Sequence, residues 1–249
     1  MSQSFLSKVL KKPEGFKPWM ALALPIWVFA GFMVAQVIVG LLLSLLDYFR
    51  VPLKYIDQPT IQTIGSLVVY LLSLAIVIGL PWMVKKFRTT KKEVGLDHYM
   101  TWTDILLAPA AFIVYILLSF ILTSIASQFP FYNIDQVQDT GFTRLNFGYE
   151  YILAFLTLVI IAPVSEEILF RGYLLGKLRK YVPVWAAILV TSLLFGIVHF
   201  AWNVGVDVFA LSIILCLLRI QTGRLWPSIL LHMLKNSIAF FFLFINPLL

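Results

Sequence analysis

Two adjacent carboxylates and a guanidinium, Glu166, Glu167 and Arg171, interrupt a long apolar run at residues 149–175. An ionisable side chain deep in a bilayer costs at least ~2.5 kcal/mol, so three together indicate a functional site by default. The simpler alternative is a structural ion pair between two helices. Glu167 and Arg171 share a helix face, whereas Glu166 is rotated from Glu167 by ~100°. Glu166 is therefore the carboxylate left for chemistry.

Two histidines and an asparagine lie in later apolar runs that we expect to be helical, namely His199, His232 and Asn236. A lone intramembrane histidine is often only a hydrogen-bond link between helices. Together with Glu166, however, two imidazoles can activate water, either as a general base or through a metal. Asn236 can donate a hydrogen bond to a developing oxyanion. Glu166, His199 and His232 also resemble a His₂Glu set that holds a catalytic Zn²⁺, and the residues allow either mechanism.

The composition requires a membrane to position these groups. Of the 249 residues, 61% are hydrophobic and 12% are charged, and the mean hydropathy is +0.93. Soluble domains are less apolar and have about twice this share of charge, so we expect an integral membrane protein. The apolar runs do not alternate, which predicts an all-α bundle rather than a barrel. The net charge is +7, and the basic residues cluster beside these apolar runs. This placement favours anionic lipid, and not nucleic acid, as the partner.

Seven apolar runs predict about seven transmembrane helices. They cover residues 20–46, 61–84, 104–126, 149–175, 183–200, 207–219 and 227–245, and the sixth is short for a crossing. A basic cluster at 85–92 indicates a cytoplasmic loop, whereas 128–148 is poor in positive charge. We therefore expect a cytoplasmic N-terminus and a C-terminus on the opposite side.

The chain reads as one membrane domain, 1–249, with a basic leader at 1–19, three N-terminal spans at 20–126 and a core at 149–245. Straight helices would place Glu166, His232 and His199 ~16, ~8 and ~24 Å from the cytoplasmic ends of their spans. Groups that must meet cannot differ so much in depth. We expect bent or broken helices, with the deviation at residues 172–182 and at Pro183.

Three motifs follow one another on separate apolar segments: Glu166-Glu167-x-x-x-Arg171, Phe195-x-x-x-His199 and His232-x-x-x-Asn236. In this order they resemble the CPBP family, the CAAX prenyl endopeptidases and the bacteriocin-processing or self-immunity membrane proteases. The resemblance covers about residues 149–244. The three N-terminal spans match only in general character.

The resemblance implies an intramembrane endopeptidase that hydrolyses a membrane-associated or hydrophobic peptide. It implies that Glu166 is the general base, that His199 is its partner, and that His232 and Asn236 stabilise the oxyanion. Glu167 and Arg171 would hold the geometry. "Metalloprotease" is the usual label for the family, although a metal-free mechanism is also open. The expected partners are a peptide or protein substrate and the lipid bilayer.

Other classes of function remain open. The chain has no His-Glu-x-x-His, Gly-x-Gly-Asp or Gly-x-Ser-x-Gly motif of other proteases. The same polar residues are compatible with a proton-coupled transporter, but no inverted repeat supports one. A non-catalytic scaffold, or an immunity or regulatory partner, is the main alternative. The small size favours a bacterial or archaeal protein of the cytoplasmic membrane, in which a prenylated substrate is not expected.

Overall fold

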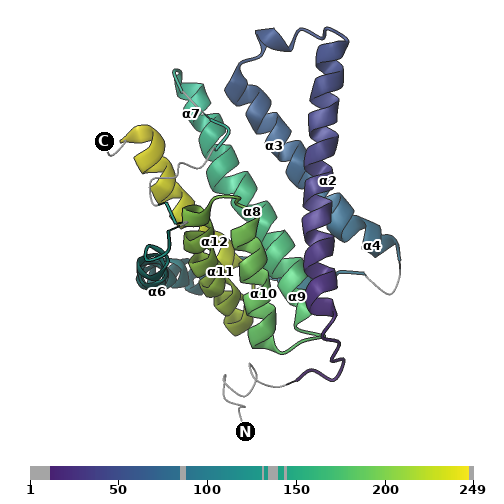
Figure 1. The fold of residues 1–249 in the computed structure, drawn as a ribbon, viewed down its shortest axis with the longest axis vertical. Helices are drawn as coiled ribbons and strands as arrows, with labels where there is room; N and C mark the ends of the chain where they lie inside the picture. Colours follow the sequence, from purple (N-terminus) through teal and green to yellow (C-terminus); the bar gives the residue numbers. More distant parts are fainter. Residues whose placement is uncertain (1–11, 85–87, 131, 134–139, 143–144, 247–249) are drawn as a thin grey trace. The chain divides into compact units, whose positions relative to one another are not determined.

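The computed structural model describes residues 12–84, 88–130, 132–133, 140–142 and 145–246, and all the regular structure within these ranges is helical (Figure 1). Six of the described helices are long and apolar enough to cross a membrane, and a shorter apolar helix adds to them. The prediction of an all-α membrane protein with about seven helices is confirmed. The cytoplasmic N-terminus stays a prediction. Residues 1–11 of the leader and residues 85–87 of the basic cluster lie outside the described ranges.

Several of the long helices are built from consecutive segments. The six spans are α2 (Met20–Tyr48), α3–η2–α4 (Gln58–Met83), α6 (Trp102–Ala126), α7–η4–α8–η5–α9 (Gly148–Leu178), α11 (Trp202–Thr222) and α12–η6 (Trp226–Ile245). The shorter apolar helix is α10 (Val184–Ile197). Short η1 (Leu53–Tyr55) and α5 (Lys91–Val94) lie in the links. Asp57 caps α3 by accepting a hydrogen bond from the Thr60 amide, and Gly223 ends α11 in the left-handed region.

The prediction for the fifth and sixth spans is wrong in its lengths. Helix α10 has 14 residues and ends at Ile197, before the expected end at residue 200. Helix α11 has 21 residues and begins at Trp202, five residues before the expected start. The expected start of this helix at residue 207 was wrong because Asp207 is charged, and a charged residue suggests the end of a span. In the structure its carboxylate accepts hydrogen bonds from Tyr115 (2.7 Å) and Ser119 (2.6 Å) of α6, so the helix continues through it.

A deviation from a straight helix is present, but it begins before the expected residues 172–182 and overlaps them only in part. The Gly148–Leu178 helix contains two π-helical segments, η4 (Leu156–Ile161) and η5 (Ile168–Leu174), on either side of α8 (Ala162–Glu167). The chain then leaves the helix at residues 179–183, before α10. Single π-turns within α-helices are frequent at functional sites. Here they flank the two glutamates.

The residues divide by their contacts into two compact units. Unit 1 comprises Met1–Phe29, Thr89–Gln138 and Glu167–Leu231. Its core joins α6 and α11 through small and aliphatic side chains, among them Ala108, Ala111, Leu211 and Leu215. Helices α10 and α11 also approach closely, because a side chain at Gly196 would meet the Gly205 carbonyl at 2.8 Å.

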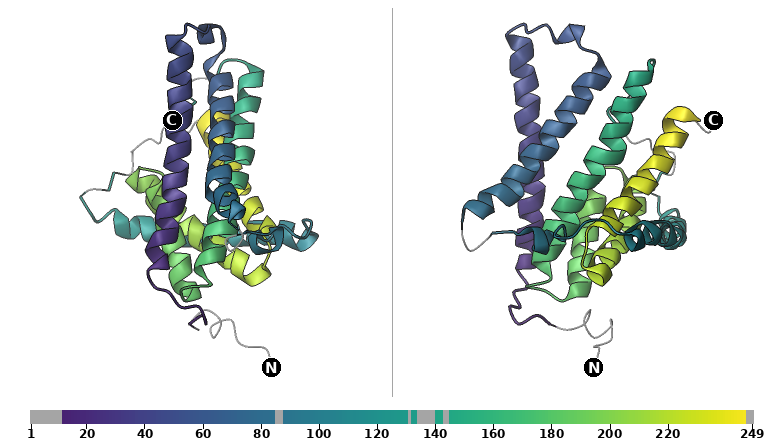
Figure 2. Two further views of the ribbon diagram at one scale, coloured as in Figure 1. Left: turned by 90° about the vertical axis from the view of Figure 1, so that its right-hand side faces the viewer. Right: turned by 180° about the vertical axis from the view of Figure 1, so that it is seen from behind.

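Unit 2 comprises Ala30–Arg88, Asp139–Glu166 and His232–Leu249. Within it, α3 lies beside the first part of the Gly148–Leu178 helix (Figure 2), where the Thr157 hydroxyl donates to that of Thr63 at 3.1 Å. Ala154, Val159 and Phe240 form its buried core with Phe142. The boundary between the units passes between Glu166 and Glu167. The prediction of a single domain stays a prediction.

Candidate active site

Glu166 has partners that sequence spacing did not indicate. On α8, its Oε1 accepts a hydrogen bond of 2.6 Å from the hydroxyl of Tyr70 on α3. Its Oε2 lies 3.8 Å from Nε2 of His232 on α12. The side chain of Glu166 is 17% exposed, whereas that of His232 is 4% exposed. One oxygen of this carboxylate is therefore held by a phenol, and the other faces a buried imidazole.

Glu167 and Arg171 form the ion pair that their spacing predicts. Arg171 Nη1 donates to Glu167 Oε1 at 2.8 Å, and both side chains are 0% exposed. Both residues belong to one continuous helix, so the pair does not join two helices. The guanidinium also lies over the ring of Phe195, 4.2 Å from its centroid. A buried pair of this kind fixes local geometry, because removing one partner leaves an uncompensated charge.

His199 lies in the turn after α10 rather than inside a helix, and the prediction of a helical position for it is wrong. The reason is local. The apolar run continues through Phe200, but the backbone of Phe200 adopts a φ of 54°, which a helix does not allow. His199 Nδ1 lies 2.7 Å from the Phe195 carbonyl oxygen. A carbonyl oxygen only accepts, so Nδ1 carries a proton, and in the neutral imidazole this tautomer has its lone pair on Nε2.

Phe195 connects the residues of unit 1 that sequence analysis selected. Its ring packs edge to face with that of His199, with centroids 5.0 Å apart, while the Arg171 guanidinium covers it. Phe195 itself is fully buried. The spacing Phe195-x-x-x-His199 thus places an aromatic ring against both the ion pair and the histidine.

Asn236 lies one helical turn after His232 on α12. Its Nδ2 donates to the carbonyl oxygen of Leu158 in η4 at 2.8 Å. An amide nitrogen carries two hydrogens, so this bond orients the group and leaves a second hydrogen to donate. Glu166, His232 and Asn236 all belong to unit 2, where the structure brings the first two together. His199, Glu167 and Arg171 belong to unit 1.

The zinc assignment to Glu166, His199 and His232 stays a prediction. Within the described ranges, no group of three or more His, Cys, Asp or Glu side chains is arranged to hold a metal ion. A catalytic Zn²⁺ takes three protein ligands at ~2.0–2.2 Å. Among the described residues, the carboxylates and imidazoles do not form such a set.

Tyr70 is the residue that sequence analysis missed. Tyrosines of membrane proteins concentrate at the two water interfaces. Tyr70 instead lies near the middle of the Gln58–Met83 helix, with leucines and valines on both sides. That position was the available signal, because a phenol in hydrocarbon needs a polar partner.

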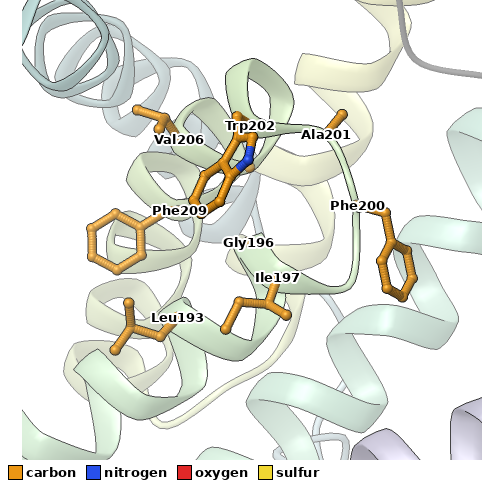
Figure 3. A pocket seen from close by; sticks show the side chains of 9 residues that line it. Leu193, Gly196, Ile197, Phe200, Ala201, Trp202, Val206 and Phe209 are labelled. Atoms are coloured by element: carbon orange, nitrogen blue, oxygen red, sulfur yellow. The ribbon is translucent and has the colours of Figure 1, made fainter. Parts of the chain in front are cut away.

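An apolar cavity of about 440 Å³ lies beside the turn that carries His199. Figure 3 shows Leu193 and Ile197 of α10 together with Trp202 and Phe209 of α11 around it. Gly196 and Gly205 also line it, where α10 and α11 approach each other closely. A cavity of this size and lining accepts an apolar group.

In comparisons with known proteins, residues 148–238 match the family model described as type II CAAX prenyl endopeptidase Rce1-like. An uncharacterized 24.3 kDa protein of Escherichia coli is 36% identical over 96 residues, covering 36% of this chain and 44% of its own length. The membrane-embedded CAAX protease MroQ of Staphylococcus aureus (strain USA300) is 32% identical over 94 residues, 35% of this chain and 38% of its own.

The putative membrane peptidase YdiL of Bacillus subtilis (strain 168) is 32% identical over 78 residues, covering 31% of this chain and 32% of its own length. The matches thus span less than half of each of these relatives. No solved structure matches the chain. The resemblance to the CAAX endopeptidases that was drawn from the three motifs is confirmed for residues 148–238 as a similarity to this family model. The peptidase activity of the whole chain stays a proposal. The label "metalloprotease" has no support from these matches.

Proposed function

We infer that this chain, whose residues 148–238 match the Rce1-like family, is a membrane-embedded endopeptidase that hydrolyses a membrane-associated or hydrophobic peptide with activated water. The observation that carries the inference is the environment of Glu166. One of its oxygens accepts from Tyr70 at 2.6 Å, and the other lies 3.8 Å from His232. A carboxylate held in this way can take a proton from water on the oxygen that faces the imidazole.

In this proposal, Glu166 removes a proton from water as the hydroxide adds to the peptide carbonyl carbon. The tetrahedral oxyanion accepts hydrogen bonds from His232 and from the second amide hydrogen of Asn236. The C–N bond then breaks, and the proton held by Glu166 passes to the leaving amine. His199 assists the same proton transfers through Nε2, the ring nitrogen that carries its lone pair.

The buried pair of Glu167 and Arg171 supports the site without touching the substrate. Glu167 ends α8 directly after Glu166, and Arg171 lies one turn further in η5, so the pair fixes the direction in which the helix presents the catalytic carboxylate. The apolar cavity beside His199 suits an apolar side chain of the substrate. A multi-pass position in a bacterial or archaeal cytoplasmic membrane completes the proposal.

The test is cleavage of a peptide library in liposomes by the wild type and by Glu166→Gln. The glutamine keeps an oxygen that accepts from Tyr70, so the variant is expected to fold. Glu14→Gln is the matched control, because Glu14 is an exposed glutamate that is distant from Glu166 in the sequence. This variant is expected to cleave at the wild-type rate. Loss of cleavage in Glu166→Gln alone supports the proposal.

A strong chelator added to the wild type separates the two forms of water activation. Full activity with chelator supports a glutamate-activated water without metal. Activity that is lost with chelator and restored by Zn²⁺ supports an ion at Glu166, His199 and His232. Cleavage by neither protein contradicts the peptidase and favours a scaffold, whereas equal cleavage by both contradicts Glu166 as the general base. Uptake whose pH dependence changes in Glu166→Gln favours a transporter.

A further inference from the structure

A second cavity, of about 290 Å³, lies between α2 and α3 within unit 2. Unlike the cavity beside His199, it is lined by polar groups on both helices. Gln36 of α2 faces it, as do Gln62, Ser66 and Tyr70 of α3. Residues at spacing four share one face of a helix, so the three polar residues of α3 form a stripe with one member in each turn.

The stripe connects the end of α3 with the candidate active site. Gln62 lies one turn from the first residue of α3, and Tyr70 lies eight residues further, ~12 Å along the helix axis. The Tyr70 hydroxyl contacts Glu166 directly. A polar path therefore runs down α3 from near the helix end to the carboxylate that we assign as general base.

Apart from Tyr70, the polar side chains that line this groove lack hydrogen-bond partners among the described residues. In the part of the chain that the structure describes, the side chains of Gln36, Gln62 and Ser66 form no hydrogen bond. In contrast, Thr63 and Ser73 of the same helical run donate to the backbone carbonyls of Pro59 and Val69, respectively. Gln36 is exposed and Gln62 and Ser66 are partly buried, so their polar atoms are accessible, and a polar group beside apolar surroundings is unfavourable without a partner. The groove therefore favours an occupant that both donates and accepts hydrogen bonds.

The volume favours a small occupant. About 290 Å³ is room for roughly ten water molecules at ~30 Å³ each. It lies just below the ~300–1,000 Å³ typical of pockets for larger ligands. An intramembrane hydrolase consumes one water for each bond that it cleaves, and hydrocarbon does not supply it.

We propose that the groove between α2 and α3 is hydrated and delivers water to Glu166, with Tyr70 at its inner end. The delivery role depends on the proposed peptidase function. The hydration of the groove does not depend on it, so the two are tested separately.

Hydration is tested by the reaction of engineered thiols, because a thiol reacts as the thiolate, which forms in water and not in hydrocarbon. The background is Cys216→Ala, since Cys216 is the single cysteine of the chain and is buried. Ser66→Cys faces the groove, whereas Leu67→Cys is its neighbour and is exposed away from the groove. In liposomes, a charged, water-soluble thiol reagent is expected to label Ser66→Cys at least tenfold faster than Leu67→Cys. Equal rates overturn the hydrated groove.

Delivery is tested by filling the groove. A side chain at Gly65, which lines the groove, would begin with no atom within 4 Å. Gly65→Leu therefore fills the groove without a clash at Cβ. Gly40 of α2 has the same open surroundings but does not line the groove, so Gly40→Leu is the matched control. Gly65→Leu is expected to lower both the labelling of Ser66→Cys and the cleavage rate at least tenfold, and Gly40→Leu to change each less than twofold.

The outcomes separate the two claims. Cleavage at the wild-type rate in Gly65→Leu, with labelling blocked, overturns delivery through this groove while the peptidase stands. Fast labelling of Ser66→Cys in a protein whose wild type cleaves no peptide overturns the peptidase, and delivery with it, while the hydrated groove stands. Fast labelling together with a tenfold loss of cleavage in Gly65→Leu alone supports both.

Discussion

Oη of Tyr70 lies 2.6 Å from Oε1 of Glu166, and this contact gives the two oxygens of one carboxylate different roles. Oε1 is held by the phenol of α3. Oε2 is 3.8 Å from the His232 imidazole and is the oxygen positioned to receive a proton. A second buried phenol, Tyr115, makes a similar bond of 2.7 Å to Asp207 in unit 1.

Tyr70→Phe is expected to lower kcat about tenfold or more and to change KM less than twofold. Hydrogen bonds to charged groups contribute ~1.5–3 kcal/mol, and this one orients the proposed base rather than the substrate. The matched control is Tyr115→Phe, which removes the same type of bond outside the site and is expected to retain kcat. Steady-state kinetics in liposomes check both. Equal losses of kcat in the two variants would show a general effect on folding and contradict the role of Tyr70.

Arg171→Met is expected to lower the free energy of unfolding by ~3–5 kcal/mol, because it removes the ion-pair partner of Glu167 at a fully buried position. The double variant Glu167→Gln/Arg171→Met removes both charges, so a smaller loss is expected. Unfolding in mixed detergent micelles measures both. A double variant as unstable as the single one would contradict the view that the unpaired charge, rather than lost packing against Phe195, is the main cost.

Asn236→Ala separates catalysis from stability. Loss of one oxyanion donor is expected to lower kcat by ~10²–10³-fold. Loss of the bond to the Leu158 carbonyl is expected to lower the free energy of unfolding by only ~1 kcal/mol. Ser237→Ala, in which the removed hydroxyl only donates to the Met233 carbonyl of its own helix, is the control. A raised KM with kcat unchanged would assign Asn236 to substrate binding instead.

Glu93, which lies in a link outside the spans, gives a prediction about how stability depends on pH. Partial burial raises the pKa of Glu93, but a hydrogen bond from Lys180, one from the Thr90 amide and the charges of Lys177 and Lys180 outweigh it and hold the pKa below its ordinary value of 4.5. Because the folded pKa is the lower one, the stabilisation is complete above 4.5 and is lost as pH falls through the lowered value.

Glu93→Gln is therefore expected to be less stable than the wild type at pH 7, with a difference that shrinks below pH 4.5. The partly exposed position of Glu93 keeps the effect small. Thermal unfolding in detergent from pH 7 to pH 3 measures it. A difference that stays constant over this range would contradict the charge pairing.

Hydropathy predicted most of the fold because spans are selected by length and apolar composition. Positions where a polar residue acquires a partner from another helix were not predictable. Asp207 is an example: its bonds to Tyr115 and Ser119 allow α11 to include it, whereas a charge alone suggests a helix end. The turn at His199 was missed for the opposite reason, since its sequence is as apolar as a helix.

The site residues could be selected by motif, and one local pair, Glu167 with Arg171, by spacing. Contacts between segments distant in sequence needed the structure. Tyr70 lies 96 residues before Glu166, and Leu158 lies 78 residues before Asn236. No periodicity encodes such pairs, although an unpaired polar group in a span indicates that a partner exists.

The most direct test of the central claim is hydrolysis in water enriched in ¹⁸O, with wild type and Glu166→Gln in liposomes and the peptide products analysed by mass spectrometry. If Glu166 activates water, the new carboxyl terminus formed by the wild type carries one ¹⁸O atom, and Glu166→Gln forms this product at least a hundredfold more slowly. Formation of the labelled product at equal rates by both proteins would contradict the account.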